Sequence, residues 1–203
     1  MHEYLTLIKN PREFFKSAAK EKISATIKRA LPIVVILLII HTTLSYFISL
    51  KINDFFHIPG RSIGFYFLTA AIALPLGIII SAALLHLSLK ILKSKSTFSQ
   101  NVKILIYVII PTSIISIISY TIVLLAPGLL AQILLFFIFA VGLLIASAIY
   151  KVIGISEQYK ISTGRAVGAY FLQFGLIIGA MIVLLIIIII LVLIFALLFK
   201  GLK

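Results

Sequence analysis

The chain has 203 residues, of which 63% are hydrophobic and 11% are charged, and its formal net charge is +13. Soluble domains have about 25% charged residues, and a chain of this length exposes too much surface to hide such an apolar surplus in its core. An ordinary soluble enzyme is therefore excluded, and an all-α, polytopic transmembrane helical bundle is predicted. The chain has no cysteine, which excludes disulfides and thiolate metal sites.

The segment 1–30, before the first apolar run, is predicted to contain an amphipathic helix. Asn10 suits the N-cap, Pro11 suits the first helical position, and Glu13 completes a pattern like a capping box. An apolar stripe follows, made of Phe14, Phe15, Ala18, Ala19, Ile23 and Ile27. Such a helix lies in the membrane interface; a solvated helix leading into the first span is the alternative. The flanking cations are candidate contacts for anionic lipid head groups: Lys16, Lys20, Lys22, Lys28 and Arg29.

Five apolar runs reach the length of about 20 residues that a helix needs to cross the hydrocarbon layer. They form a predicted five-span membrane domain over 31–203, with spans at 31–50, 63–89, 104–126, 128–150 and 166–199. Each is predicted as a helix because backbone groups in lipid must be paired within the segment. No Asp, Glu, Lys or Arg falls inside these runs. The first run has the full length of a span, so we expect it to stay as an anchor.

The last run, 166–199, is too long for one straight crossing. As a helix it would measure about 51 Å, against about 30 Å of hydrocarbon. We expect its early part, which carries Gly168, Gln173, Gly175 and Gly179, to lie against protein or near the interface. The all-apolar stretch Met181–Phe199 would then cross mainly against lipid.

The basic residues between the runs predict the orientation. With five spans, fourteen Lys and Arg residues fall on one side and four on the other, namely Lys51, Arg61, Lys200 and Lys203. The positive-inside rule then places the amino terminus in the cytoplasm and the carboxyl terminus outside a cell (plasma) membrane. The cations form no patch with interleaved aromatic residues, so nucleic acid is not predicted as a partner. The lipid bilayer and anionic head groups are the predicted partners.

Polar side chains inside the predicted spans are few. His41 lies near mid-depth in the first span, and His86 lies in the last turn of the second. Ser113, Ser116 and Ser119 mark one polar face of the third span. Together these five are candidates for lining a polar cavity; the alternative is that each packs in a seam and bonds to a neighbouring helix. The two histidines would differ by about 10 Å in depth, so no metal site is predicted.

Small residues mark two candidate helix-packing seams. Gly142 and Ala146 form one small-xxx-small pair, and Gly175 and Gly179 form a GxxxG pair. Packing inside one chain is favoured for both pairs, and contact with a second copy of the chain is the alternative.

Catalytic signals are absent from the sequence. The five acidic residues form no paired-carboxylate pattern, and there is no P-loop, GxSxG or HExxH. We therefore predict no catalytic residue, no cofactor and no enzymatic activity.

Three segments occur in an order that is typical of one family. They are Asn10–Phe15; His86–Lys90 followed by Ser96-Thr97-Phe98, Tyr107 and Pro111; and Tyr150–Ser156 followed by Arg165-Ala166. With five spans and an inside amino terminus, this order resembles the Yip (Ypt/Rab-interacting) membrane proteins in their prokaryotic form. The resemblance implies the fold and leaves the function open. Lys93–Ser96 replaces the glycine-rich loop of many members, and the acidic and aromatic motifs of eukaryotic members are missing, so Rab binding is not carried over.

Two functional hypotheses follow. The first is a non-enzymatic membrane scaffold or membrane-organising protein, with membrane-protein partners or a second copy of the chain, because basic segments dominate one side and catalytic groups are missing. The alternative is a transporter or channel for a small solute or a lipid, using the polar cavity between spans one to three.

Overall fold

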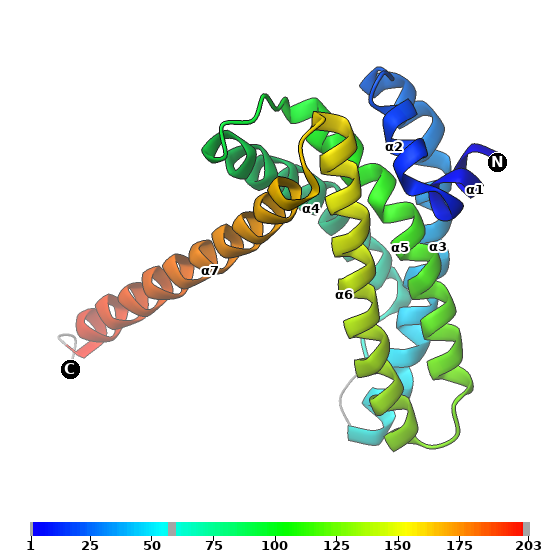
Figure 1. The fold of residues 1–203 in the computed structure, drawn as a ribbon. Helices are drawn as coiled ribbons and strands as arrows, with labels where there is room; N and C mark the ends of the chain where they lie inside the picture. The colour runs from blue at the N-terminus through cyan, green and yellow to red at the C-terminus, as the bar shows by residue number, and fades with distance from the viewer. Residues whose placement is uncertain (1, 57–59, 201–203) are drawn as a thin grey trace.

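The computed structural model describes residues 2–56 and 60–200. This part of the chain contains seven α-helices and no strand, which confirms the all-α prediction (Figure 1). In chain order they are α1 (His2–Lys9), α2 (Pro11–Ala18), α3 (Ile23–Phe56), α4 (Ile63–Ile91), α5 (Phe98–Leu125), α6 (Leu129–Tyr159) and α7 (Thr163–Lys200).

Five of these helices, α3 to α7, are long and apolar enough to cross a membrane. Several extend past the apolar runs predicted from the sequence: α3 begins at Ile23 rather than Leu31, and α6 continues to Tyr159 rather than ending at Tyr150. Lys, Arg and Glu are good helix formers, so a helix can continue after its hydrophobic stretch ends. The long α5 consequently includes Lys103, which the sequence analysis had assigned to a connection.

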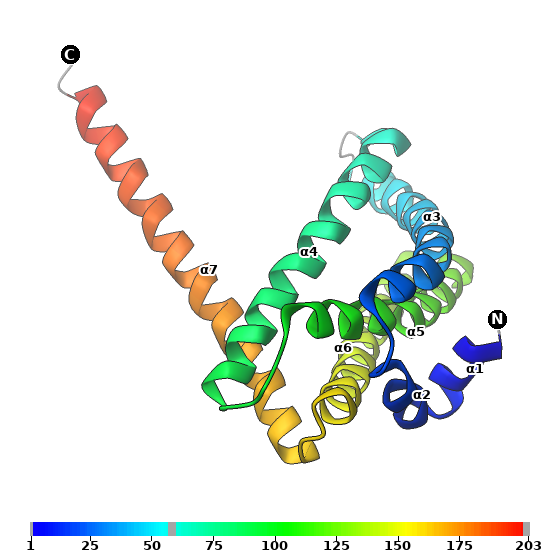
Figure 2. The same cartoon turned by 90° about the horizontal axis from the view of Figure 1, so that it is seen from above.

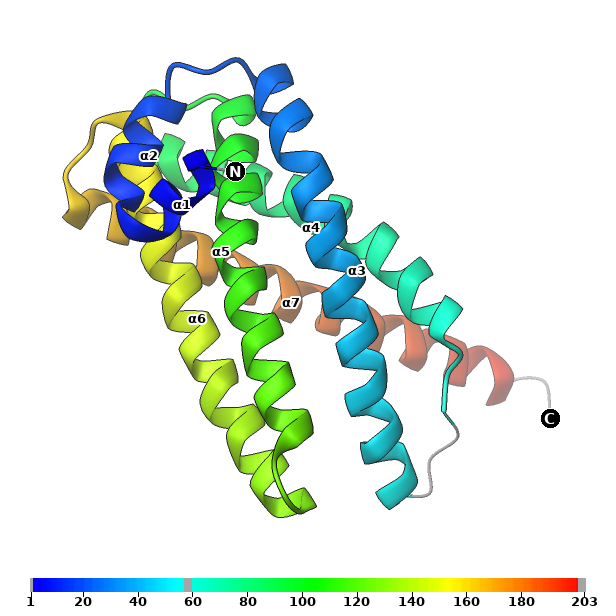
Figure 3. The ribbon, with the colours of Figure 1, turned by 90° about the vertical axis from the view of Figure 1, so that its right-hand side faces the viewer.

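The helices are arranged around α3, α5 and α6, which lie side by side (Figures 1 and 3). We call the end of this bundle that carries α1, α2 and the connections 92–97 and 160–162 the basic end. The opposite end carries the tight turn at 126–128, in which Gly128 has a φ of +77°. Helices α4 and α7 contact each other near the basic end, and α7 then diverges from the bundle (Figure 2).

The buried core sits mainly at the basic end. It includes Phe15, Leu85, Leu89, Ile104 and Ile155, none of which is exposed. Farther along the long helices most large apolar side chains are exposed. In water such a surface would drive aggregation, whereas lipid accommodates it, so the burial pattern agrees with a membrane protein.

Helix α7 is continuous over 38 residues. Its early part packs against α4 and α6, with Ala166, Ala169 and Gln173 buried. Gly175 and Gly179, which the sequence analysis assigned to the same part, are exposed. From Met181 to Val192 every side chain is exposed. The two parts of the long apolar run thus differ in their contacts although they form one helix.

Candidate functional site

The amino-terminal unit, residues 2–22, is the most elaborate feature of the basic end. Its second helix begins as predicted: the Asn10 side chain accepts a hydrogen bond from the backbone N–H of Glu13 (3.4 Å), and Asn10 Nδ2 donates to Glu13 Oε2 (2.9 Å). Pro11 occupies the first turn. The predicted apolar stripe does not continue as one helix, because α2 ends at Ala18 and Ile23 begins α3.

The apolar face of α2 is covered by protein. Phe14 and Phe15 are buried, and the Phe14 ring packs edge-on against Tyr107 of α5 with centroids 4.9 Å apart. Phe15 lies against α6 at Gly154. A Cβ atom at Gly154 would lie 3.1 Å from Phe15 Cε1 and 3.0 Å from Ile104 Cγ2. Glycine at this position therefore allows the α2–α6 contact to close.

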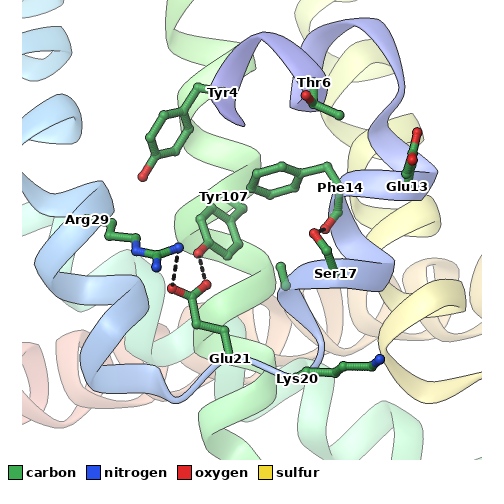
Figure 4. A pocket seen from close by; sticks show the side chains of 10 residues that line it. Tyr4, Thr6, Glu13, Phe14, Ser17, Lys20, Glu21, Arg29 and Tyr107 are labelled. Atoms are coloured by element: carbon green, nitrogen blue, oxygen red, sulfur yellow. Dashed lines mark hydrogen bonds and ion pairs between the residues drawn. The ribbon is translucent and has the colours of Figure 1, made fainter. Parts of the chain in front are cut away.

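A polar network ties the end of this unit to α3 and α5. The Tyr107 hydroxyl donates a hydrogen bond to Glu21 Oε2 (2.5 Å), and Arg29 forms an ion pair with Glu21 Oε1 (3.4 Å). Figure 4 shows both side chains directed at the Glu21 carboxylate. Thr26 Oγ1 lies 3.4 Å from the same carboxylate. The partly buried Glu21 charge is thus paired and hydrogen-bonded, which is the condition for keeping a charge in such a place.

Lys103 holds the carbonyl groups at the end of α2. Its Nζ donates to the carbonyl oxygens of Glu21 (2.8 Å), Ala18 (3.3 Å) and Ala19 (3.4 Å). The side chain is only 3% exposed. A cation here supplies a donor to carbonyl groups at and just beyond the end of α2, of which Ala18 also accepts from the Glu21 N–H (3.1 Å), and it opposes the negative end of the helix dipole. Lys103 is therefore a structural residue of the bundle and does not contribute to an exposed basic loop.

A cavity of about 480 Å³ lies between the amino-terminal unit and the bundle (Figure 4). Its lining combines both signs of charge with aromatic side chains: Tyr4, Thr6, Glu13, Phe14, Ser17, Ala18, Lys20, Glu21, Arg29 and Tyr107. Because acidic and basic groups are balanced around it, the lining does not select an ionic ligand of either sign.

A second polar cluster connects α4, α5 and α6 at the same end. Tyr159 donates a hydrogen bond to Asn101 Oδ1 (2.5 Å), and Asn101 Nδ2 donates to the Ala82 carbonyl (3.2 Å). His86 is hydrogen-bonded to Ser96 through Nδ1 (2.9 Å). These contacts fix the connection 92–97 on the bundle.

The five cations predicted to contact anionic lipid, Lys16, Lys20, Lys22, Lys28 and Arg29, are all exposed at the basic end. Arg29 retains 56% of its side-chain exposure while it pairs with Glu21. The structure brings the set to one end of the molecule, and contact with lipid remains a prediction.

Three of the five residues predicted to line a polar cavity lie around one cavity, whose lining is mostly aliphatic. His41, Ser113 and Ser116 surround a cavity of about 560 Å³ formed by α3, α4, α5 and α6. The other two lie elsewhere: His86 binds Ser96, and Ser119 donates to the Ile115 carbonyl of its own helix (2.8 Å).

The glycines of the predicted packing seams have empty space around them, with no neighbouring helix of the described chain close by. A Cβ atom at Gly142, Gly175 or Gly179 would meet nothing within 4 Å among the described residues. Ala146, the partner of Gly142, is half-buried. No described side chain closes on these glycines, so packing inside one chain stays a prediction. The alternative, contact with a second copy, also stays a prediction.

Sequence reasoning missed Glu21, Tyr107, Lys103 and Asn101 as members of the basic-end networks. Glu21 could have been recognised as a network residue, since it is one of only five acidic residues in a chain with a net charge of +13. Lys103 was hidden because it directly precedes the apolar run 104–126, so it looked like the last residue of a connection. Its burial depends on where α2 docks, which no local pattern encodes.

The segments that suggested a family resemblance meet at this site: Phe15 from the first, Tyr107 from the second and Gly154 from the third. The Yip1 domain family matches residues 5–185, which includes all three segments. Comparison with curated proteins and with solved structures gives no match.

Proposed function

The chain belongs to the Yip1 family, and on this premise we propose that it is a non-enzymatic membrane scaffold that binds anionic lipid head groups through the exposed cations of its basic end. The amino terminus and this end then face the cytoplasm of the cell, in the plasma membrane. Anionic lipids give the cytoplasmic leaflet a negative surface potential, which attracts basic segments close to the membrane.

One observation carries the proposal: most of the exposed cations predicted to contact lipid belong to the amino-terminal unit, and this unit is docked on the bundle. Lys16, Lys20 and Lys22 belong to the amino-terminal unit, whose docking contacts are the buried Phe15 and the three carbonyl bonds of Lys103. Lys28 follows on α3. A docked unit presents its charges without the entropy cost of ordering a flexible tail on binding, which suits a scaffold.

The experiment measures anionic-lipid association of the full-length chain. The protein is reconstituted in vesicles of phosphatidylcholine containing a minor fraction of spin-labelled phosphatidylglycerol, and the motionally restricted lipid is quantified. The changed chain carries Lys16→Gln, Lys20→Gln, Lys22→Gln and Lys28→Gln. Each cation near an anionic surface contributes about 1 kcal/mol, so the preference for phosphatidylglycerol should fall by about tenfold or more.

The matched control carries Arg at the same four positions, which keeps the charge and should keep the preference. Arg29 is left unchanged in both chains because its ion pair with Glu21 belongs to the docking network. An unchanged lipid preference in the four-Gln chain, with the fold intact, would contradict the proposal.

Binding of membrane-protein partners and self-association are parts of the scaffold proposal that rest on the exposed surfaces alone. The open Gly175–Gly179 face is where a second copy could approach closely. The transporter hypothesis gains no support from the family match, and it remains a prediction from the sequence.

A further inference from the structure

The cavity between α3, α4, α5 and α6 combines an apolar lining with polar groups that have no partner. Ser116 is only 6% exposed and lines the cavity. Among the described residues, the side chains of Ser116, Ser113 and His41 form no hydrogen bond with another residue, although the His41 ring lies 5.0 Å from the Tyr120 ring. Polar groups buried in a membrane domain are costly unless a partner satisfies them.

Other hydroxyls on the same helix behave differently. Ser119 donates to the Ile115 carbonyl (2.8 Å), and Thr121 donates to the Ile117 carbonyl (2.9 Å). Bonding back to the preceding turn is the usual way in which a serine or threonine is satisfied inside a helix. Ser113 and Ser116 therefore stand out as groups available to a ligand.

The lining also limits the ligand's chemistry. Among the described residues around the cavity none is charged, and most are aliphatic, such as Val34, Leu38 and Leu143. A charged group would enter without a counter-charge, which a low-dielectric site disfavours. The volume of about 560 Å³ lies within the range of about 300–1,000 Å³ that is usual for small-molecule sites. Leu144 lines the cavity and is 66% exposed, so the cavity reaches the lipid-facing surface of α6.

We propose that this cavity binds an uncharged, single-chain amphiphile with a hydroxyl head group, which enters from the lipid. The head group hydrogen-bonds to Ser113, Ser116 and His41, and the chain lies against the aliphatic side chains. Binding in this cavity does not depend on the binding of lipid head groups at the basic end. Neutralising Lys16, Lys20, Lys22 and Lys28 should therefore leave amphiphile binding in the cavity unchanged.

The test uses the full-length chain in phosphatidylcholine nanodiscs and a hexadecanol probe that carries a mid-chain diazirine. After illumination, labelled peptides are mapped by mass spectrometry, with and without excess unlabelled hexadecanol. Labelling that saturates, that hexadecanol displaces and that falls on peptides lining the cavity is the expected result. Labelling that does not saturate, or that is equally dense on residues 181–192 of α7, would overturn the proposal.

Two variants make the test specific. The double change Ser113→Ala with Ser116→Ala should lower saturable labelling roughly fivefold or more, since the head group loses two hydrogen-bond partners. It removes no hydrogen bond within the described chain, so folding should be retained. The matched control, Ser119→Ala with Thr121→Ala on the same helix, should leave labelling unchanged. A third variant, Ala140→Phe, fills the cavity and should abolish labelling. Equal labelling in the first variant and the control would refute the assigned head-group site.

Discussion

Gly154 is a residue at which the docking of two helices depends on a single missing methyl group. The atoms that a Cβ would meet belong to Phe15 and Ile104, both fully buried. Neither side chain is free to move aside, because protein interiors are closely packed. The contact between α2 and α6 is therefore sensitive to any larger residue at position 154.

Gly154→Val should destabilise the chain by about 1–3 kcal/mol, which is the usual cost of forcing extra methyl groups into a packed core. Gly142→Val is the matched control, because Gly142 lies on the same helix and a Cβ there meets nothing within 4 Å. Thermal unfolding in one detergent measures both. Equal midpoints for the two variants would show that Gly154 is not a close-packed position.

Single residues differ in how far the sequence predicts their roles. The Asn10 cap was predictable because its partner, Glu13, lies three residues away. The pairing of Glu21 with Tyr107 joins residues 86 apart in the chain, and no spacing rule covers such a distance. Sequence reasoning placed Ser113 and Ser116 on one polar face of the third span from helical spacing alone, and the structure places both at the cavity between the helices.

At the scale of elements, the amino-terminal unit is a separate pair of short helices held on the bundle by side-chain contacts. Helices of eight residues are marginal on their own in water, so α1 and α2 depend on these contacts. Phe15 supplies apolar burial, and Lys103 supplies hydrogen bonds to the end of α2. The sequence predicted the start of α2 but not its docking against α5 and α6.

Lys103→Met should loosen the amino-terminal unit. The substitution keeps most of the side-chain volume but leaves the carbonyls of Ala19 and Glu21 without the Lys103 donor, while the Ala18 carbonyl keeps its bond from the Glu21 N–H (3.1 Å). Unsatisfied polar groups cost about 1–3 kcal/mol, so amide exchange in α2 should accelerate by roughly tenfold or more. Hydrogen–deuterium exchange with mass spectrometry measures this change.

Lys95→Met is the matched control, since it removes an equal charge from an exposed position in the nearby connection 92–97. Its exchange in α2 should equal that of the unchanged chain. If the two lysine variants exchange alike in α2, the docking role of Lys103 is refuted.

The whole molecule is asymmetric along its long axis: the core and the polar networks gather at the basic end, and the rest of the long helices exposes apolar side chains. The sequence predicted the five long apolar helices because hydrophobic length is a local property. It could not predict that α7 diverges from the bundle. A helix that faces lipid and a helix that is buried in protein both have an all-apolar sequence, so the sequence does not distinguish them. The open Gly175 and Gly179 follow from that divergence.

The orientation of the five crossings decides whether the basic end meets the cytoplasmic leaflet, and the chain's lack of cysteine makes it directly measurable. Single cysteines are introduced as Lys16→Cys, Lys95→Cys and Arg61→Cys, and intact cells that produce each chain are treated with a membrane-impermeant maleimide. We predict labelling of Arg61→Cys in intact cells, and labelling of Lys16→Cys and Lys95→Cys only after permeabilisation. Labelling of the two basic-end positions in intact cells would contradict the account, because the exposed cations would then face away from the cytoplasmic leaflet.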